Sequence, residues 1–447
     1  MAASQSPFHY AKGGDQDSAA SSDSEIALCA RKRVAFRLLP LVFLLYVIAY
    51  LDRVNVSFAN LRMSADLGFS DRVYGLGVGM FFVSYVLLEI PGAIIVERWS
   101  ARKWIARIMI SWGLVTAGTG FVHDATQFYT ARFLLGLAEG SFFPGMIVYL
   151  THWFCARDRG RAIACLYCAV PTASLVGAPV AGLLLGVNWL GLAGWRWLFI
   201  LEGIPAVALG VVTIYFLTDR PSQARWLPIA ERDWLTKQLE LELQSKQQSR
   251  KYSIREAFSE KQVLLLVGAW VFALMGALGN TYWVPTFLKR ISGLPNRNVT
   301  YLLMIPSIIA ITGTLINGWH SDKTRERRRH TAIPLLAAGA LFVCVIAARG
   351  QVSLAISFLL LATASFYVCQ AVLWTIPTLL LSDTAAAASF GLINTVGQVG
   401  GFIGPYIIGF LNDRTHTLTA SFGFIAIAYF ISGSLILCLR KENPMPG

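Results

Sequence analysis

Long apolar runs alternate with short polar breaks along almost the whole chain. A transmembrane helix needs about 20 mostly apolar residues in a row, and the sequence offers twelve runs of about that length. We predict membrane spans at 34–60, 74–97, 103–122, 127–153, 161–187, 195–217, 262–289, 299–319, 330–348, 353–382, 384–411 and 417–438.

One long polar segment divides these runs six and six, so the pattern predicts five regions. Residues 1–33 are polar and are expected to form a disordered cytoplasmic tail. An N-terminal six-helix bundle follows at 34–217, and the polar segment at 218–261 is a cytoplasmic linker that contains an amphipathic helix. A C-terminal six-helix bundle at 262–439 precedes a short cytoplasmic tail at 440–447. The expected fold class is therefore an all-α integral membrane protein.

Composition agrees with a membrane protein. Of the 447 residues, 55% are hydrophobic and 14% are charged, where a soluble domain has roughly a quarter charged. The net charge of +13 comes from short basic clusters between the apolar runs, and most of these clusters fall on one side of the predicted topology. Such clusters mark the cytoplasmic side. We therefore expect both termini in the cytoplasm, a plasma-membrane location (the inner membrane in a bacterium), contact with the lipid bilayer and no nucleic-acid partner.

Four charged residues stand out because they lie within or at the end of apolar spans. Asp52 and Arg53 follow the apolar run Leu38–Ala49, while Arg132 and Glu139 lie seven residues apart on the fourth span, which puts them on one helix face. A charge at such a place costs a few kcal/mol unless it faces water or a partner. The four charges predict a functional site between the spans, although a purely structural salt-bridge set is the alternative.

This set of charges suits the transport of an organic anion. The Arg53 guanidinium stays charged and grips a carboxylate through two hydrogen bonds. Asp52 and Glu139 are acids whose charge changes when a proton binds, and a nearby arginine competes with that proton. A substrate that occupies the arginine would release the acids to bind protons, which couples the two binding events reciprocally.

Polar and aromatic side chains on other spans could complete the substrate site, although core packing is an equal alternative for any one of them. The candidates are Tyr50, Tyr85, Asn280, Tyr282, Gln370, Trp374, Asn394 and Gln398.

Several motifs resemble those of the major facilitator superfamily. Its cytoplasmic loop motif is matched in part after the second span, at Glu97, Arg98 and Arg102, and Asp322 holds the similar place after the eighth. These four residues are the expected cytoplasmic gate. Further stretches are similar to the anion:cation symporter branch, which includes galactonate, glucarate, tartrate and phthalate permeases. They are Tyr50–Asn55, Arg132–Gly140, Gly194–Pro205, Asp219–Pro221 and Gly400–Pro405.

The resemblance implies twelve transmembrane helices in two pseudo-symmetric bundles, and proton-coupled uptake of a small organic carboxylate by alternating access. It assigns the protons to Asp52 and Glu139, the anion to Arg53, and ion-pair support to Arg132. Tyr50, Tyr85, Trp374 and Asn394 match substrate-site positions of the family. Val170 stands where sugar-acid carriers often have a polar residue, which favours a less hydroxylated, aromatic cargo.

Other functions remain open at this stage. The same architecture would serve a sodium-coupled or uncoupled transporter or exporter, and a membrane anion sensor is a different class. An enzyme is not expected, because no nucleophile–base or metal constellation is present. The six histidines lie outside the span interiors or at their edges, and no phosphate-binding loop occurs. We expect no metal and no cofactor, and a monomer whose partners are an organic anion and protons.

Overall fold

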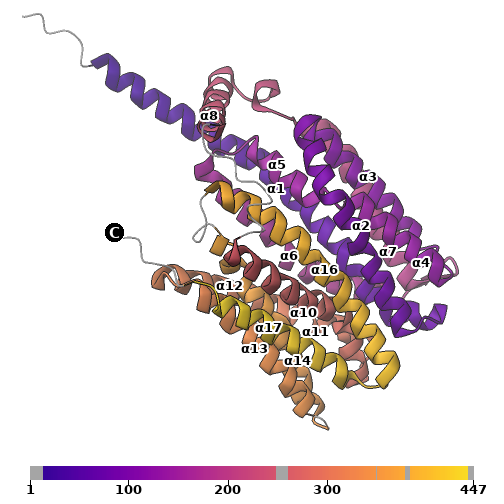
Figure 1. Cartoon of the computed structure of the whole chain (residues 1–447). Coiled ribbons are helices and arrows are strands. Elements are labelled where there is room, and N and C mark those ends of the chain that lie inside the picture. The colour runs from indigo at the N-terminus through magenta and orange to yellow at the C-terminus, as the bar shows by residue number, and fades with distance from the viewer. Residues whose placement is uncertain (1–13, 248–259, 349, 378–382, 441–447) are drawn as a thin grey trace, which may run out of the picture.

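The computed structural model describes residues 14–247, 260–348, 350–377 and 383–440, and helices dominate them (Figure 1). The first half contains α1 (Gly14–Leu67), α2 (Asp71–Arg98), α3 (Ala101–Thr119), α4 (Ala125–Glu139), α5 (Phe142–Thr151), α6 (Ala156–Leu184) and α7 (Gly194–Phe216). The second half contains α10 (Lys261–Ser292), α11 (Asn296–Leu302), α12 (Met304–Thr324), α13 (Arg328–Ala347), α14 (Val352–Leu373), α16 (Asp383–Thr415) and α17 (Leu418–Leu437).

Smaller elements connect these helices. A two-stranded antiparallel sheet, β1 (Asn188–Trp189) with β2 (Leu192–Ala193), joins α6 to α7. The linker between the halves holds a 3-10 turn, η1 (Pro221–Gln223), and α8 (Ile229–Gln247). The helix expected in the linker is therefore present, while residues 248–259 of the linker lie outside the described residues.

Each predicted span corresponds to helical structure. The fourth is interrupted after Glu139 into α4 and α5, and the eighth is interrupted at Leu303 into α11 and α12. Within the described ranges, ten helical segments are long and apolar enough to cross a membrane. Neither α3 nor α16 is among these ten: α3 begins with the basic residues Arg102, Lys103 and Arg107, and α16 is rich in glycine. The last part of the predicted span 353–382 falls in undescribed residues.

The prediction of a disordered tail at 1–33 is wrong from Gly14 onward, because α1 already begins there. Polar partners hold this extension: Arg31 pairs with Asp158 of α6 at 2.5 Å, and Arg33 pairs with Glu231 of α8 at 3.0 Å. Residues 1–13 and the predicted tail after residue 440 lie outside the described part of the chain.

The start of α1 and the linker helix lie at the same end of the bundle, which we call the α8 end (Figure 1). At the opposite or far end, polar contacts join the two halves. Arg290 of α10 pairs with Asp71 of α2 at 2.6 Å. Asn60 of α1 donates to Thr286 of α10 at 3.0 Å. The two halves therefore hold each other at the far end.

Glycines allow α2 and α16 to approach closely beside these contacts. A Cβ atom at Gly75 would lie 2.5 Å from the Pro405 carbonyl oxygen, and one at Gly409 would lie 2.3 Å from the Asp71 carbonyl oxygen. Both distances are too short for a side chain, so only glycine fits. Small residues at helix crossings are a common means of packing helices inside a membrane.

Candidate functional site

A buried ion pair lies between α1 and α4. The Arg53 guanidinium donates through Nη2 to Oε1 of Glu139, whose side chain is almost wholly buried. The second carboxyl oxygen of Glu139 and Nε of Arg53 are also buried, and neither has a hydrogen-bond partner among the described residues. The pair is therefore incompletely satisfied on both sides, with one donor of Arg53 and one acceptor of Glu139 unpaired.

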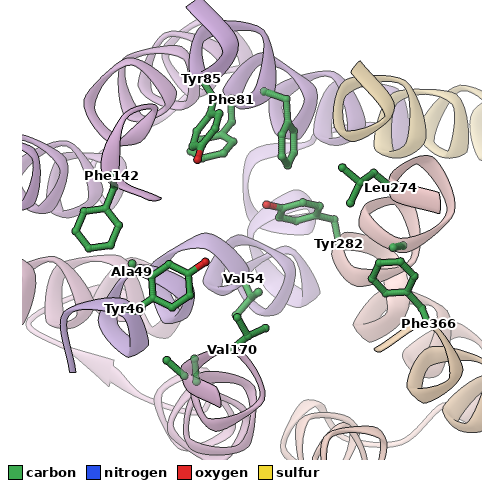
Figure 2. Close-up of a cluster of buried hydrophobic side chains, with 14 of the residues drawn as sticks. Tyr46, Ala49, Val54, Phe81, Tyr85, Phe142, Val170, Leu274, Tyr282 and Phe366 are labelled. Atoms are coloured by element: carbon green, nitrogen blue, oxygen red, sulfur yellow. The ribbon is translucent and has the colours of Figure 1, made fainter. Parts of the chain in front are cut away.

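Aromatic rings surround this pair. The Arg53 guanidinium lies 5.7 Å from the centre of the Tyr50 ring, 5.6 Å from Phe81 and 5.3 Å from Tyr85, distances at which a cation is attracted to a ring face. Figure 2 shows the hydroxyl groups of Tyr85 and of its neighbours Tyr46 and Tyr282 directed toward the same space between the helices. Arg53 thus lies in an aromatic surround that also offers hydroxyl groups.

Asp52 points elsewhere, although it is next to Arg53 in the chain. It is 1% exposed and accepts hydrogen bonds from Trp112 and Thr116 of α3, the latter at 2.7 Å, and from Asn55 of its own helix at 3.0 Å. Adjacent helix residues project about 100° apart. Arg53 therefore points toward Glu139 of α4, while Asp52 points toward α3.

Arg132 is buried, with 1% exposure, but the structure does not pair it with Asp52 or Glu139 as expected. Glu139 pairs with Arg53 instead. The Arg132 guanidinium lies 5.1 Å from the centre of the Phe81 ring, and its Nε and Nη2 atoms have no hydrogen-bond partner within the described ranges. Arg132 is still close enough to Asp52 and Glu139 for their charges to interact, so its support of these acids stays a prediction without a direct ion pair.

The second half contributes the remaining candidates. Asn280 is buried and donates to Thr363 at 3.0 Å. Trp374 packs edge-on against Trp270, with ring centres 5.1 Å apart. Gln370 and Gln398 are half-buried. These residues lie on α10, at the end of α14 and on α16, so the structure supports a packing role at least for Asn280 and Trp374.

A pocket between the halves includes Val170. Its walls carry Ser57 of α1 and Thr281 and Tyr367 of the second half, whose hydroxyl oxygens are 3.3 Å apart. Val54 is a further part of the wall. Val170 therefore adds an apolar surface to a lining that is otherwise mixed.

Residues expected to form a cytoplasmic gate lie at the α8 end but have local partners. Asp322 pairs with Arg327 of its own half at 2.6 Å, and the Arg102 backbone N–H donates to Asp219 at 2.9 Å. Glu97 and Arg98 are exposed. Asp322 and Arg102 are thus held within their own halves, and a gating role for the four residues stays a prediction.

Sequence reasoning missed Glu89 of α2. This residue is 5% exposed and accepts a hydrogen bond from Asn394 of α16, so it joins the two halves. An acid inside the predicted span 74–97 is the same signal that singled out Asp52, and it could have found Glu89 as well. The partner of Asn394 could not have been read from the sequence.

A bundle of membrane-length helices in two halves, with a buried ion pair between its helices, defines a multi-pass membrane transport protein. Residues 42–405 match the family model described as Major Facilitator Superfamily. The chain is 39% identical to a protein of Agrobacterium vitis named "Putative tartrate transporter", over 96% of this chain and 95% of the relative. This chain belongs to the Major Facilitator Superfamily, and its relatives support the anion-carrying branch within it.

Two further similarities complete the comparison. A protein of Acinetobacter baumannii named "Quinolone resistance transporter" is 36% identical over 89% of this chain and 91% of the relative. The crystal structure of a D-xylose-proton symporter superimposes with a TM-score of 0.74 at 14% sequence identity, covering 91% of this chain and 98% of that one. The predicted family and fold are confirmed, and the protein is a transporter rather than an enzyme.

Proposed function

We propose that this transporter takes up a small organic carboxylate together with protons. The observation that carries the proposal is the buried pair of Arg53 and Glu139 inside an aromatic surround. While Arg53 is paired with ionised Glu139, it cannot bind a substrate carboxylate. Protonation of Glu139 weakens this pair and makes Arg53 available to the substrate. Proton binding and anion binding then favour each other, which is the thermodynamic requirement for symport.

The cargo that best fits the charges is a dianion. Arg132 is a second buried guanidinium near Phe81, whose ring also lies close to Arg53. A dicarboxylate would place one carboxyl group on each arginine, and the relative from Agrobacterium vitis is named for tartrate, which is a dicarboxylate. The apolar wall at Val170 favours a cargo with a less hydroxylated face, including aromatic acids.

Alternating access is proposed from the distribution of contacts between the halves. The pair Asp71–Arg290 and the Asn60–Thr286 hydrogen bond close the far end. The basic residues Arg98, Arg102 and Lys103 lie at the α8 end, which supports the cytoplasm on that side. With this orientation, the far end is the outer entrance, and it is closed. The proposed carrier lies in the inner membrane or plasma membrane, has both termini in the cytoplasm and works as a monomer.

Uptake into proteoliposomes tests the proposal. Labelled tartrate should accumulate when the pH is lower outside than inside, and an uncoupler should abolish the accumulation. Accumulation that requires a sodium gradient and ignores the pH gradient would refute proton coupling. A panel of aromatic and sugar acids as competitors would then identify the preferred cargo.

Export is a second candidate, because one relative is named for quinolone resistance. Everted vesicles separate the two directions. An exporter that exchanges drug for protons would load such vesicles with a quinolone when their lumen is acidic, whereas a carboxylate symporter would not.

A further inference from the structure

A buried hydrogen bond joins the two halves of the protein beside the anion site. Asn394 of α16 donates through Nδ2 to Oε1 of Glu89 on α2, and 305 positions separate the two residues in the chain. The Glu89 side chain is 5% exposed. The ion pair of Arg53 with Glu139 uses neither residue, so this contact between the halves has a role that is still to be explained.

The contact belongs to the tight seam between α2 and α16. The glycine contacts that begin at the far end continue inward to Gly79, where a Cβ atom would lie 2.7 Å from the Phe402 ring. Glu89 follows Gly79 along α2, while Asn394 precedes Phe402 along α16, so the two helices run antiparallel. The seam therefore brings an acid of the first half against an amide of the second.

The same contact borders the cation that we assign to the cargo. Glu89 lies on the same face of α2 as Tyr85, because four residues make about one helical turn. The Tyr85 ring centre lies 5.3 Å from the Arg53 guanidinium. Arg53 is also close enough to the Glu89 carboxyl group for their charges to interact. Glu89 and Asn394 thus lie at the edge of the anion site.

Asn394 is one of the residues that the family resemblance assigns to the substrate, and in this structure its amide already donates to an acid. A cargo oxygen that reached this amide would compete with Glu89 for the donor. A cargo carboxylate would also stand next to the Glu89 carboxylate, and two like charges in a buried place disfavour each other. The amide therefore serves either the acid or the cargo.

We propose that Glu89 is a placeholder for the cargo: its carboxylate occupies the Asn394 amide in the empty carrier, and a cargo oxygen takes its place on binding. The inference rests on the proposed carboxylate cargo. Glu89 then acts through Asn394 as a positioning residue. A cargo that displaces it carries a carboxyl group for Arg53 and a second carboxyl or hydroxyl oxygen for Asn394.

This exchange links cargo binding to the contact between the halves. In the empty carrier the hydrogen bond from Asn394 to Glu89 joins α16 to α2 directly. After the exchange, the cargo itself connects Asn394 of the second half to Arg53 of the first. A monocarboxylate without a second acceptor reaches only Arg53 and leaves the Glu89–Asn394 hydrogen bond in place, so it should be a poor cargo.

Titration calorimetry of the full-length protein with tartrate at neutral pH tests the competition. Glu89→Gln keeps an oxygen that accepts from the Asn394 amide, so this variant should fold. It should bind tartrate about fivefold more tightly, because a hydrogen bond to a charged group is stronger than a neutral one by about 1 kcal/mol. Glu242→Gln changes an acid at the α8 end, which pairs with Arg159, and should leave the affinity unchanged.

Exchange of the two groups separates a placeholder from a purely structural contact. Asn394→Asp places two carboxylates in contact, so the melting temperature at pH 8 should fall. Adding Glu89→Gln restores one amide and one carboxylate in reversed positions and should restore the melting temperature. Tartrate should still bind the double variant roughly tenfold or more weakly than the wild type, because a carboxylate at position 394 offers the cargo a like charge instead of a donor.

Each outcome decides between these roles. Unchanged tartrate affinity in Glu89→Gln would overturn the proposal. A double variant that regains both the melting temperature and wild-type binding would also overturn it, because the contact would then be structural alone. If Glu89→Gln tightens binding as expected while uptake ignores the pH gradient, the placeholder stands and the proposed symport fails.

Discussion

Replacement of Glu139 by glutamine should strengthen carboxylate binding, although it removes an acid from the site. In the structure Glu139 occupies the Arg53 guanidinium, so a substrate carboxylate has to displace it. Glutamine resembles the protonated acid and no longer competes as an anion. The variant should therefore bind substrate as the protonated wild type does, at any pH in the neutral range.

The size of the effect follows from the strength of the pair. A hydrogen bond to a charged group contributes about 1.5–3 kcal/mol. The Arg53 side chain is 19% exposed, so part of the attraction is screened by solvent. We therefore expect the free energy of substrate binding to become more favourable by about 1–2 kcal/mol, which corresponds to roughly 5- to 30-fold tighter binding.

Titration calorimetry of the purified protein with tartrate at neutral pH measures this change. Glu242→Gln is the control, because Glu242 pairs with Arg159 at 3.2 Å at the α8 end, far from the site. It should leave the affinity unchanged. Proteoliposomes provide the second measurement: Glu139→Gln should still exchange substrate across the membrane but should not accumulate it under a pH gradient.

Unchanged or weaker binding in Glu139→Gln would refute the competition between this acid and the substrate. Accumulation at the wild-type level would remove Glu139 from proton coupling even if binding tightened. The two measurements therefore test separate steps of the reasoning.

Three further changes test other parts of the structure. Arg53→Lys should reduce uptake about a hundredfold or more with normal expression, because lysine lacks the two-pronged grip on a carboxylate; near-normal uptake would contradict the anion role. Trp112→Phe should lower the free energy of unfolding by about 1–3 kcal/mol, because a buried carboxylate loses a donor, and an unchanged melting temperature would argue against it. Arg290→Gln should break the pair with Asp71 at the far end, so a cysteine introduced at Thr286 in a cysteine-free background should react faster with an external thiol reagent. Equal labelling rates would show that this pair does not hold the far end closed.

The fold could be predicted largely from hydrophobic runs, because membrane helices must satisfy their backbone hydrogen bonds internally and need a fixed apolar length. What the runs could not predict is how far a helix continues beyond the membrane. α1 extends back to Gly14 through a polar segment, since Arg31 and Arg33 find carboxylates on α6 and α8. Those partners are more than a hundred residues away in the chain.

The buried charged residues of the candidate site could be recognised in the sequence, but their pairings could not. Asp52, Arg53, Arg132 and Glu139 are conspicuous in sequence because charges in apolar spans are costly. Which acid meets which arginine depends on helix rotation, and a rotation of one residue position changes the answer. Glu89 was overlooked, and its partner Asn394 lies on α16 in the other half of the chain, a pairing that only a structure reveals.

The positions of Asp52 and Arg53 suggest how one helix serves two tasks. Arg53 connects α1 to α4 through its ion pair with Glu139. Asp52 connects α1 to α3 through its hydrogen bonds with Trp112 and Thr116. A rigid helix cannot rotate one residue without moving the other, so a change at the anion site is felt at the α3 seam and the reverse. Because Asp52 and Arg53 are adjacent, a movement of α1 caused by substrate binding at Arg53 also moves the buried acid Asp52.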